Sequence, residues 1–425
     1  MRAVVVGGGL AGLAAALDLA DEGAAVTLLE ARPSLGGAVQ TLPERDGDPA
    51  PPPDNGQHVA LGCCSEYLRF LRRIGQGAAI RRVRLAMPVI DERRRVAHLG
   101  AGMVPLLRYS HLTTGDRLRV GLVAQRLGQM RPENHDHETF GELLRRLGTS
   151  RSAIDRFWDV FIRPALNLPA EEASAALGIF TVQTALLGPR RASDLLLPTQ
   201  PLGAMHGDAA SHALEDAGAS VRTRSRAVSL EADAVVTSDG ERVEADRVVL
   251  AVPPADSAAL LGEPAPLLGD SPIVSVHLLF DRRVLVPPLA ALLGSPAHWL
   301  FDRGRITGNK PETGQYLTVV SSGAPELAAT RGRDLVELMR TAIVERLGPA
   351  KLLWSRVSRE PEATFAGRPG TTALRPPPQT GNPNVVRAGA WTGTGWPATM
   401  EGAIRSGRAA ARALLQSPLP EHASP

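Results

Sequence analysis

MRAVVVGGGLAGLAAALDLADEGAAVTLLEARPSLGG, residues 1–37, is the stretch of sequence that decides the fold. Residues 1–6 predict a strand, and the glycine-rich segment 7–12 follows directly. An Ala/Leu-rich helix to about Glu22 and a second strand over residues 25–29 complete the pattern. A glycine-rich turn between a strand and a helix predicts a dinucleotide-binding site, with the phosphates at the helix N-terminus.

The spacing of the glycines supports this interpretation. Gly7 permits the tight turn, Gly9 lets backbone N–H groups approach a pyrophosphate, and Gly12 lets the helix pack closely on the strand. Ala11 lies in the same turn and belongs to the predicted nucleotide-binding set. Glu30 ends the second strand, where a carboxylate can accept both hydroxyls of an adenosine ribose. A purely structural glycine turn is the weaker alternative.

A second pair of glycines follows shortly after Glu30. Ala31, Arg32 and then Gly36-Gly37 resemble the second glycine motif of the FAD-dependent amine oxidase and phytoene desaturase superfamily. Two residues without side chains let a loop lie against a flavin and its pyrophosphate. The superfamily usually has arginine next, where this chain has Ala38, so Arg32 or Arg45 is expected to compensate.

Length and composition bound the class of protein. A chain of 425 residues predicts two domains, and 44% hydrophobic with 21% charged residues is typical of a globular protein. The net charge is only +3, although 45 of the 47 basic residues are arginine. Arginine runs such as Arg81/Arg82/Arg84 and Arg93–Arg95 are solvated faces or contacts for anionic lipid headgroups, and the first is favoured. No basic stripe with interleaved aromatics predicts nucleic-acid binding.

The cysteines and the apolar runs bear on location. Cys63 and Cys64 are adjacent, which favours two thiols in a reducing compartment over a disulfide or a metal site. No run approaches the ~20 apolar residues of a membrane span. We therefore expect a cytoplasmic protein that is at most peripheral, at the inner face of the cell membrane.

The order of predicted elements divides the chain into five segments. Residues 64–187 show mostly helical periodicity, and short β-rich segments with an Asp239-Gly240 turn follow from residue 220. The prediction is an α/β fold, with a Rossmann-type FAD-binding domain interleaved with a substrate domain of mixed sheet and helices. The FAD-binding segments are 1–62, 203–266 and 355–425, the helical substrate segment is 63–202, and the sheet substrate segment is 267–354.

Several motifs narrow the resemblance to one branch, the squalene-associated FAD-dependent desaturases, which are hydroxysqualene dehydroxylases. The matching stretches cover about residues 3–412 and are 54–58, 157–158, 164–167, 201–203, 272–282, 299–303 and 388–403. The discontinuous order of segments is also that of the amine oxidase-like flavoproteins.

The resemblance implies further cofactor-binding residues. Gly389 approaches the ribityl chain, Ala390 stands where most members have aspartate, and Met400 opens a helix that points at the flavin. Val228 matches a position whose backbone contacts adenine in relatives, and an ordinary core valine is the alternative.

Asp54-Asn55-Gly56-Gln57-His58 is the best candidate for chemistry. In the family this stretch lies near the flavin and the substrate, so His58 is a candidate proton donor and Asp54 can orient it or hold the strand. The alternative is a turn at Asp54 and a satisfied interior histidine at His58.

The resemblance implies FAD-dependent reductive removal of the hydroxyl of hydroxysqualene, giving squalene for hopanoid or other triterpene synthesis. A carotenoid desaturase or isomerase and a flavin-free prenyl-binding protein are the rivals. An amine or protoporphyrinogen oxidase is disfavoured, because neither lysine of the chain, Lys310 or Lys351, has a flavin-site context. The expected partners are an isoprenoid substrate and a membrane surface. The reductant, and an association with upstream squalene-pathway enzymes, stay open.

Overall fold

Five parallel strands from separate parts of the chain form the first sheet of the computed structural model, which describes residues 1–416. Their order is β18-β12-β1-β2-β8, and every neighbouring pair is parallel. Strands of a parallel sheet are covered on both faces, which explains the continuous apolar runs in the sequence. The bounds are β1 Arg2–Val6, β2 Ala25–Leu29, β8 Ser220–Arg222, β12 Arg247–Leu250 and β18 Val385–Arg387.

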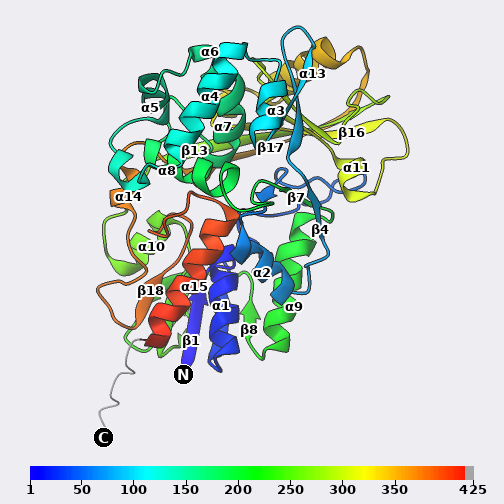
Figure 1. The fold of residues 1–425 in the computed structure, drawn as a ribbon. Coiled ribbons are helices and arrows are strands. Elements are labelled where there is room, and N and C mark those ends of the chain that lie inside the picture. The colour runs from blue at the N-terminus through cyan, green and yellow to red at the C-terminus, as the bar shows by residue number, and fades with distance from the viewer. Residues whose placement is uncertain (417–425) are drawn as a thin grey trace, which may run out of the picture.

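Two helices from opposite ends of the chain pack side by side on this sheet. They are α1 (Leu10–Asp21) and α15 (Met400–Gln416), the blue and red helices of Figure 1. A Cβ on Gly407 of α15 would lie 2.0 Å from the carbonyl oxygen of Ala11 on α1. The absence of a side chain at Gly407 therefore allows the two helices to approach this closely.

The second sheet has seven strands and forms the sheet of the other large part of the molecule. Its order is β17-β13-β16-β15-β14-β5-β6, antiparallel except for the parallel pair β14 and β5. The bounds are β5 Ala86–Ile90, β6 Val96–Gly100, β13 Asp270–Phe280, β14 Leu289–Leu292, β15 Trp299–Asp302, β16 Gln315–Ser322 and β17 Leu352–Phe365.

A group of short helices covers one end of this sheet, as the upper part of Figure 1 shows. Phe157 and Trp158, one of the stretches that carry the family resemblance, lie in their shared apolar core. The bounds are α3 Met103–Arg108, α4 Thr114–Leu127, η1 Pro132–His135, α5 Phe140–Arg146, α6 Arg151–Ala153, η2 Ile154–Trp158, α7 Asp159–Leu166, α8 Ala175–Thr181 and η3 Val182–Leu186, of which η1 is a 3₁₀ helix and η2 and η3 are π-helical turns.

The remaining elements connect the two parts. Two three-stranded sheets have the orders β11-β10-β9 and β3-β7-β4, and Asp239 and Gly240 lie between β10 and β11 as predicted. The bounds are β3 Ala60–Leu61, β4 Ile80–Val83, β7 Leu195–Pro198, β9 Ala227–Leu230, β10 Ala234–Thr237, β11 Arg242–Glu244, α2 Ser65–Arg73, η4 Gly203–Asp208 (π-helical), α9 Ala209–Asp216, α10 Pro254–Leu261, α11 Arg303–Thr307, α12 Pro325–Ala329, α13 Gly332–Leu347 and α14 Thr371–Leu374.

Within the mostly helical region 64–187, the sequence analysis identified no strands at residues 80–100, which form β4, β5 and β6. Pro88 and the run Arg93–Arg95 obscured the alternation, and the strands form because β5 pairs with β14, far along the chain. β17 runs through the predicted domain limit between residues 354 and 355 and pairs with β13 as far as Phe365. We propose that the last nucleotide-binding segment begins after this strand.

The contact at Gly407 generates a stability prediction. Gly407→Ala places a methyl group against the Ala11 carbonyl, and overpacking of this kind costs about 1–3 kcal/mol, more than the gain from replacing a helical glycine. A urea unfolding midpoint well below that of the wild-type protein is expected. Gly381→Ala, where a Cβ meets nothing within 4 Å, is the control. Equal midpoints for the two variants would contradict the packing argument.

Candidate cofactor and active site

The first glycine motif forms a turn into α1 that accepts no side chains. Gly7 has a φ of +104°, and a Cβ on Gly12 would lie 1.9 Å from the carbonyl oxygen of Gly7. Gly9 precedes α1, where no side chain caps the helix and no acidic residue occupies its first turn. The N–H groups at this end of α1 therefore face a position suited to an anion.

The second glycine pair packs directly on the first. Gly36 and Gly37 have φ values of +111° and +61°, and the N–H of Gly36 donates to the carbonyl oxygen of Gly8 at 2.8 Å. A Cβ on Gly37 would lie 2.8 Å from the Cα of Gly9. The two motifs thus form one cradle of bare backbone, which the sequence spacing alone did not reveal. Ala11 lies in the first turn of α1, behind this cradle.

Glu30 lies at the end of β2 beside the cradle. Its side chain is 8% exposed, and its two oxygens accept from the N–H groups of Gly8 and Arg32, both at 2.7 Å. The carboxylate is thereby held in place, with lone pairs left for further donors. The side chains of Ala31 and Arg32 are exposed.

The C-terminal loop between β18 and α15 has a support that the sequence analysis missed. Gly389 has a φ of +151° and donates its N–H to Ser406 Oγ at 2.8 Å. The buried Arg375 donates from Nη2 to the carbonyl oxygens of Ala390 at 3.0 Å and Thr392 at 2.6 Å. Burial lowers the pKa of Arg375 to about 10, so it stays charged at neutral pH. The sequence analysis could not identify this contact, because Arg375 lies outside the matching stretch 388–403.

Met400 and Val228, the two remaining residues that were predicted to contact FAD, lie on a helix and a strand. Met400 is the first residue of α15, as predicted. Val228 lies on β9, at the edge of its sheet, and is 50% exposed, so it is not a core valine.

Asp54 is the most densely bonded residue of the Asp54–His58 stretch. It is 1% exposed, and Oδ2 accepts from Arg303 Nη2 at 2.6 Å. Oδ1 accepts from Thr41 Oγ1 at 2.8 Å and from the N–H of Leu202 at 2.9 Å. Burial raises the pKa of the Asp54 carboxyl, while Arg303 and these hydrogen bonds oppose the rise.

Arg303 is the first residue of α11, directly after β15, and joins the second sheet to the segment that holds Asp54 and Gln57. It is 1% exposed, and its Nη1 donates to Gln57 Oε1 at 2.7 Å. The sequence analysis placed Arg303 in a branch motif but gave it no role. A buried carboxylate needs a charged partner, so the prediction of a functional Asp54 was the one feature of the sequence that could have indicated this arginine.

A group of buried polar atoms without partners lies around this ion pair. Within residues 1–416 these atoms are Gln57 Nε2, Ser275 Oγ, His277 Nε2 and Arg303 Nε. Ser275 Oγ lies 2.9 Å from the position of a Cβ on Gly56, and His58 Nε2 lies 3.8 Å from it. Buried polar atoms are almost always paired in folded proteins, so this group is suited to a polar ligand or water.

His58 lies half-buried in this region. Burial and the neighbouring His206 lower its pKa to about 4, so the ring is neutral at pH 7. His206 is fully buried, and its Nε2 lies 2.9 Å from the hydroxyl of Tyr67. His277 is buried on β13, where burial and then Arg303 lower its pKa to about 3. Among residues 1–416 no group of three or more histidines, cysteines or carboxylates is arranged to hold a metal.

A two-motif backbone cradle on a parallel α/β sheet, next to a buried polar cluster on a second sheet, defines a flavoprotein oxidoreductase. The chain belongs to the flavin-containing amine oxidoreductase family, whose model matches residues 10–415. FAD is its cofactor. The glycine cradle, the uncapped end of α1 and Glu30 fit the pyrophosphate and ribose of this group.

Relatives within the family narrow the comparison. The chain is similar to hydroxysqualene dehydroxylases from Sinorhizobium fredii, at 29% identity, and Rhodopseudomonas palustris, at 30%, with 97% of each chain covered. A probable zeta-carotene desaturase from Synechococcus elongatus is 26% identical over 98% of this chain and 99% of its own. A solved structure, a putative protoporphyrinogen oxidase from Exiguobacterium, superposes with a TM-score of 0.73 at 17% identity, covering 98% of this chain and 99% of its own. This last likeness concerns the fold alone.

Glu30 generates a binding prediction. Glu30→Ala removes the buried acceptor beside the cradle and should weaken FAD binding by about 1–3 kcal/mol, measured by titrating the apoprotein and following flavin fluorescence. Glu22→Ala is the control, because it removes an exposed carboxylate at the opposite end of α1 from the cradle. Unchanged affinity in the Glu30 variant would exclude a role in FAD binding.

The buried histidines generate a pH prediction. An unfolded histidine has a pKa of about 6.5, so below pH 6.5 the unfolded chain binds more protons than the folded one, and stability falls as the pH is lowered. Each fully buried histidine contributes about 1 kcal/mol of this loss between pH 7 and pH 5.5. Urea unfolding at the two pH values should show a smaller loss in His277→Gln than in the wild type. His212→Gln, at an exposed position, should match the wild type, and an equal loss in His277→Gln would refute the prediction.

Proposed function

We propose that the protein removes the allylic hydroxyl of hydroxysqualene reductively to give squalene, as a step of hopanoid or related triterpene synthesis. The observation that carries the proposal is the similarity to hydroxysqualene dehydroxylases over nearly the whole chain. The buried polar cluster around Arg303 supports it, since a hydroxylated isoprenoid needs one polar position in an otherwise apolar site.

The reaction replaces a C–O bond by a C–H bond and consumes two electrons. Hydroxide is a poor leaving group, so a proton must reach the oxygen as the bond breaks and water departs. Reduced FAD supplies a hydride when bound. The protein's residues hold the substrate, exclude water and deliver the proton.

We propose roles for the cluster residues on this basis. His58 delivers the proton, and Ser275 Oγ, which forms no hydrogen bond among residues 1–416, accepts or donates one at the departing oxygen. Asp54 positions the segment through its ion pair with Arg303. Because the pKa of His58 is about 4, its protonated fraction, and with it the rate, falls as the pH rises above 4.

The proposed FAD-binding set follows from the cradle and the C-terminal loop. Glu30 accepts the ribose hydroxyls, the glycine cradle holds the pyrophosphate, and the loop supported by Arg375 lies along the flavin. The complete set is Gly7, Gly9, Ala11, Gly12, Glu30, Ala31, Arg32, Gly36, Gly37, Val228, Gly389, Ala390 and Met400.

A carotenoid desaturase is the second candidate, and the similarity to a probable zeta-carotene desaturase favours it. That reaction is oxidative and begins with oxidised flavin, so the redox state required for turnover separates the two candidates. The flavin-free prenyl-binding alternative is wrong, because the family contains flavin. For either lipid reaction we further propose a peripheral position at the membrane, where an isoprenoid substrate resides.

Anaerobic turnover tests the proposal. The protein with chemically reduced FAD should convert hydroxysqualene to squalene, and the protein with oxidised FAD should not. His58→Ala should lower the turnover number by about 10²–10⁴-fold with FAD content unchanged, the usual range for the loss of a general acid. His58→Gln keeps a hydrogen bond but cannot transfer the proton, so it should be equally slow.

Two results would contradict the proposal at different levels. Full activity in both His58 variants would exclude the histidine as the acid. Desaturation of phytoene by the oxidised enzyme, without turnover of hydroxysqualene, would establish the carotenoid reaction instead.

A further inference from the structure

An exposed apolar surface lies on the helical part of the molecule, on α3 and α4. Large apolar side chains that stay roughly half exposed lie on these helices and at the adjacent Leu187, namely Met103 54%, Val104 60%, Leu107 46%, Leu118 55%, Leu122 54% and Leu187 46%. We name these six side chains the α3–α4 surface. Contiguous exposed apolar groups of this kind mark interaction sites in soluble proteins.

Close contacts join the members of this surface. A Cβ on Gly121 of α4 would lie 3.3 Å from Met103 Cε, so α3 packs against α4. A Cβ on Gly128 would lie 3.1 Å from Leu187 Cδ1, so Leu187 lies against the end of α4. On α4 the exposed Leu118 and Leu122 are four residues apart and share one face, while Val120 and Val123 are buried on the other.

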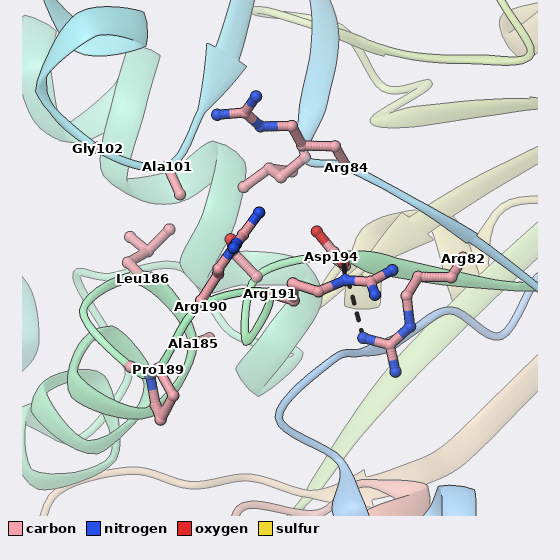
Figure 2. A pocket seen from close by; sticks show the side chains of 13 residues that line it. Arg82, Arg84, Ala101, Gly102, Ala185, Leu186, Pro189, Arg190, Arg191 and Asp194 are labelled. Carbon is pink, nitrogen blue, oxygen red and sulfur yellow. Dashed lines mark hydrogen bonds and ion pairs between the residues drawn. The ribbon is translucent and has the colours of Figure 1, made fainter.

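A basic cavity of about 540 Å³ opens directly beside the surface. Figure 2 shows Arg82, Arg84, Arg190 and Arg191 around it. Ala101 and Gly102, which also line it, immediately precede Met103, and the lining residue Leu186 immediately precedes Leu187. The arginines and the apolar side chains are therefore parts of one continuous face.

The four arginines of the cavity share a single carboxylate, so their positive charge is not fully neutralised. Asp194 is the one carboxylate in its lining and is shared, at 2.9 Å from Arg191 Nε and 3.7 Å from Arg82 Nη1. Within residues 1–416 the side chains of Arg84 and Arg190 form no ion pair or hydrogen bond. Guanidinium groups that lack acceptors are suited to phosphate oxygens, which they bind through paired N–H donors.

The charge around the surface has the same sign. Residues 81–128 contain ten arginines and three carboxylates. Asp91 is paired with Arg95, Glu92 with Arg156, and Asp116 is hydrogen-bonded to Ser150 and Thr113. Such a face is complementary to an anionic surface with an apolar interior, which is the composition of a bilayer with anionic lipids.

We propose that the α3–α4 surface docks on an anionic lipid bilayer, with its apolar side chains in the headgroup boundary and a lipid phosphate in the arginine cavity. The proposal rests on the proposed function in one respect: docking would give the enzyme access to an isoprenoid substrate in the membrane. Among residues 1–416 no helix is long and apolar enough to cross a membrane. Docking by this face supplies a contact that needs no spanning helix.

Vesicle flotation of the FAD-loaded protein tests the proposal. The wild type should float with vesicles of phosphatidylcholine mixed with phosphatidylglycerol, and much less with phosphatidylcholine alone. Arg84→Glu/Arg190→Glu should raise the apparent Kd for the anionic vesicles about tenfold or more. Met103→Ser/Val104→Ser should reduce flotation with both kinds of vesicle, because it removes exposed apolar groups.

Matched control variants show whether flotation depends on the α3–α4 surface itself or on the protein's overall charge and exposed apolar area. Arg331→Glu/Arg333→Glu reverses two exposed arginines on α13, and Leu267→Ser changes an apolar residue that is 87% exposed elsewhere. Both should float as the wild type does. Loss of flotation in the controls equal to that in the surface variants, or wild-type flotation in the surface variants, would overturn the proposal.

Further measurements distinguish the other outcomes. Full displacement from vesicles by glycerol 3-phosphate would show a small-anion site in place of bilayer docking, and self-association without flotation would show an interface between copies of the chain. Turnover of hydroxysqualene in detergent micelles should be unchanged in all surface variants. Its absence in the wild type would refute the proposed function while leaving the flotation result to decide the docking surface.

Discussion

The buried ion pair between Asp54 and Arg303 is the interaction on which the candidate site depends, because it holds the Asp54–His58 stretch against the end of β15. Both side chains are 1% exposed, so neither charge has access to water. A charge in such a position is tolerated only when paired and hydrogen-bonded, and Asp54 meets this need with Thr41 and Leu202 as well as Arg303. Three parts of the chain that are far apart in sequence, around Asp54, Leu202 and Arg303, are thereby held together at one point.

Two differently built parts of the site lie near this ion pair, since Asn55 next to Asp54 donates to the carbonyl oxygen of Ala38 next to Gly37. On one side Gly9 and Gly37 present bare backbone, which suits the pyrophosphate of FAD because no side chain competes for the space. On the other side, strand β13 presents Ser275, whose buried Oγ forms no hydrogen bond among residues 1–416. The cradle thus suits the cofactor, and the cluster provides a polar position beside it.

The sequence predicted the features that are local in the chain. The turn at Gly7–Gly12 and the strand ending at Glu30 depend on neighbouring residues, and the structure places the first turn and Glu30 side by side. Features that depend on distant pairing were missed. Arg375 donates to the carbonyl oxygen of Ala390, which lies fifteen residues later in the loop between β18 and α15. Strand β5 forms only because it pairs with β14. Neither contact leaves a periodic pattern, and Arg303 was visible only as part of a motif without a role.

A double-mutant cycle at the ion pair tests the account most directly. Asp54→Asn and Arg303→Met each leave one buried charge unpaired and should each lower the free energy of unfolding by about 3–5 kcal/mol. The double variant, which buries no charge at this point, should lose far less than the sum of the two. Losses that add within about 0.5 kcal/mol would show that the two charges act independently and would contradict the account.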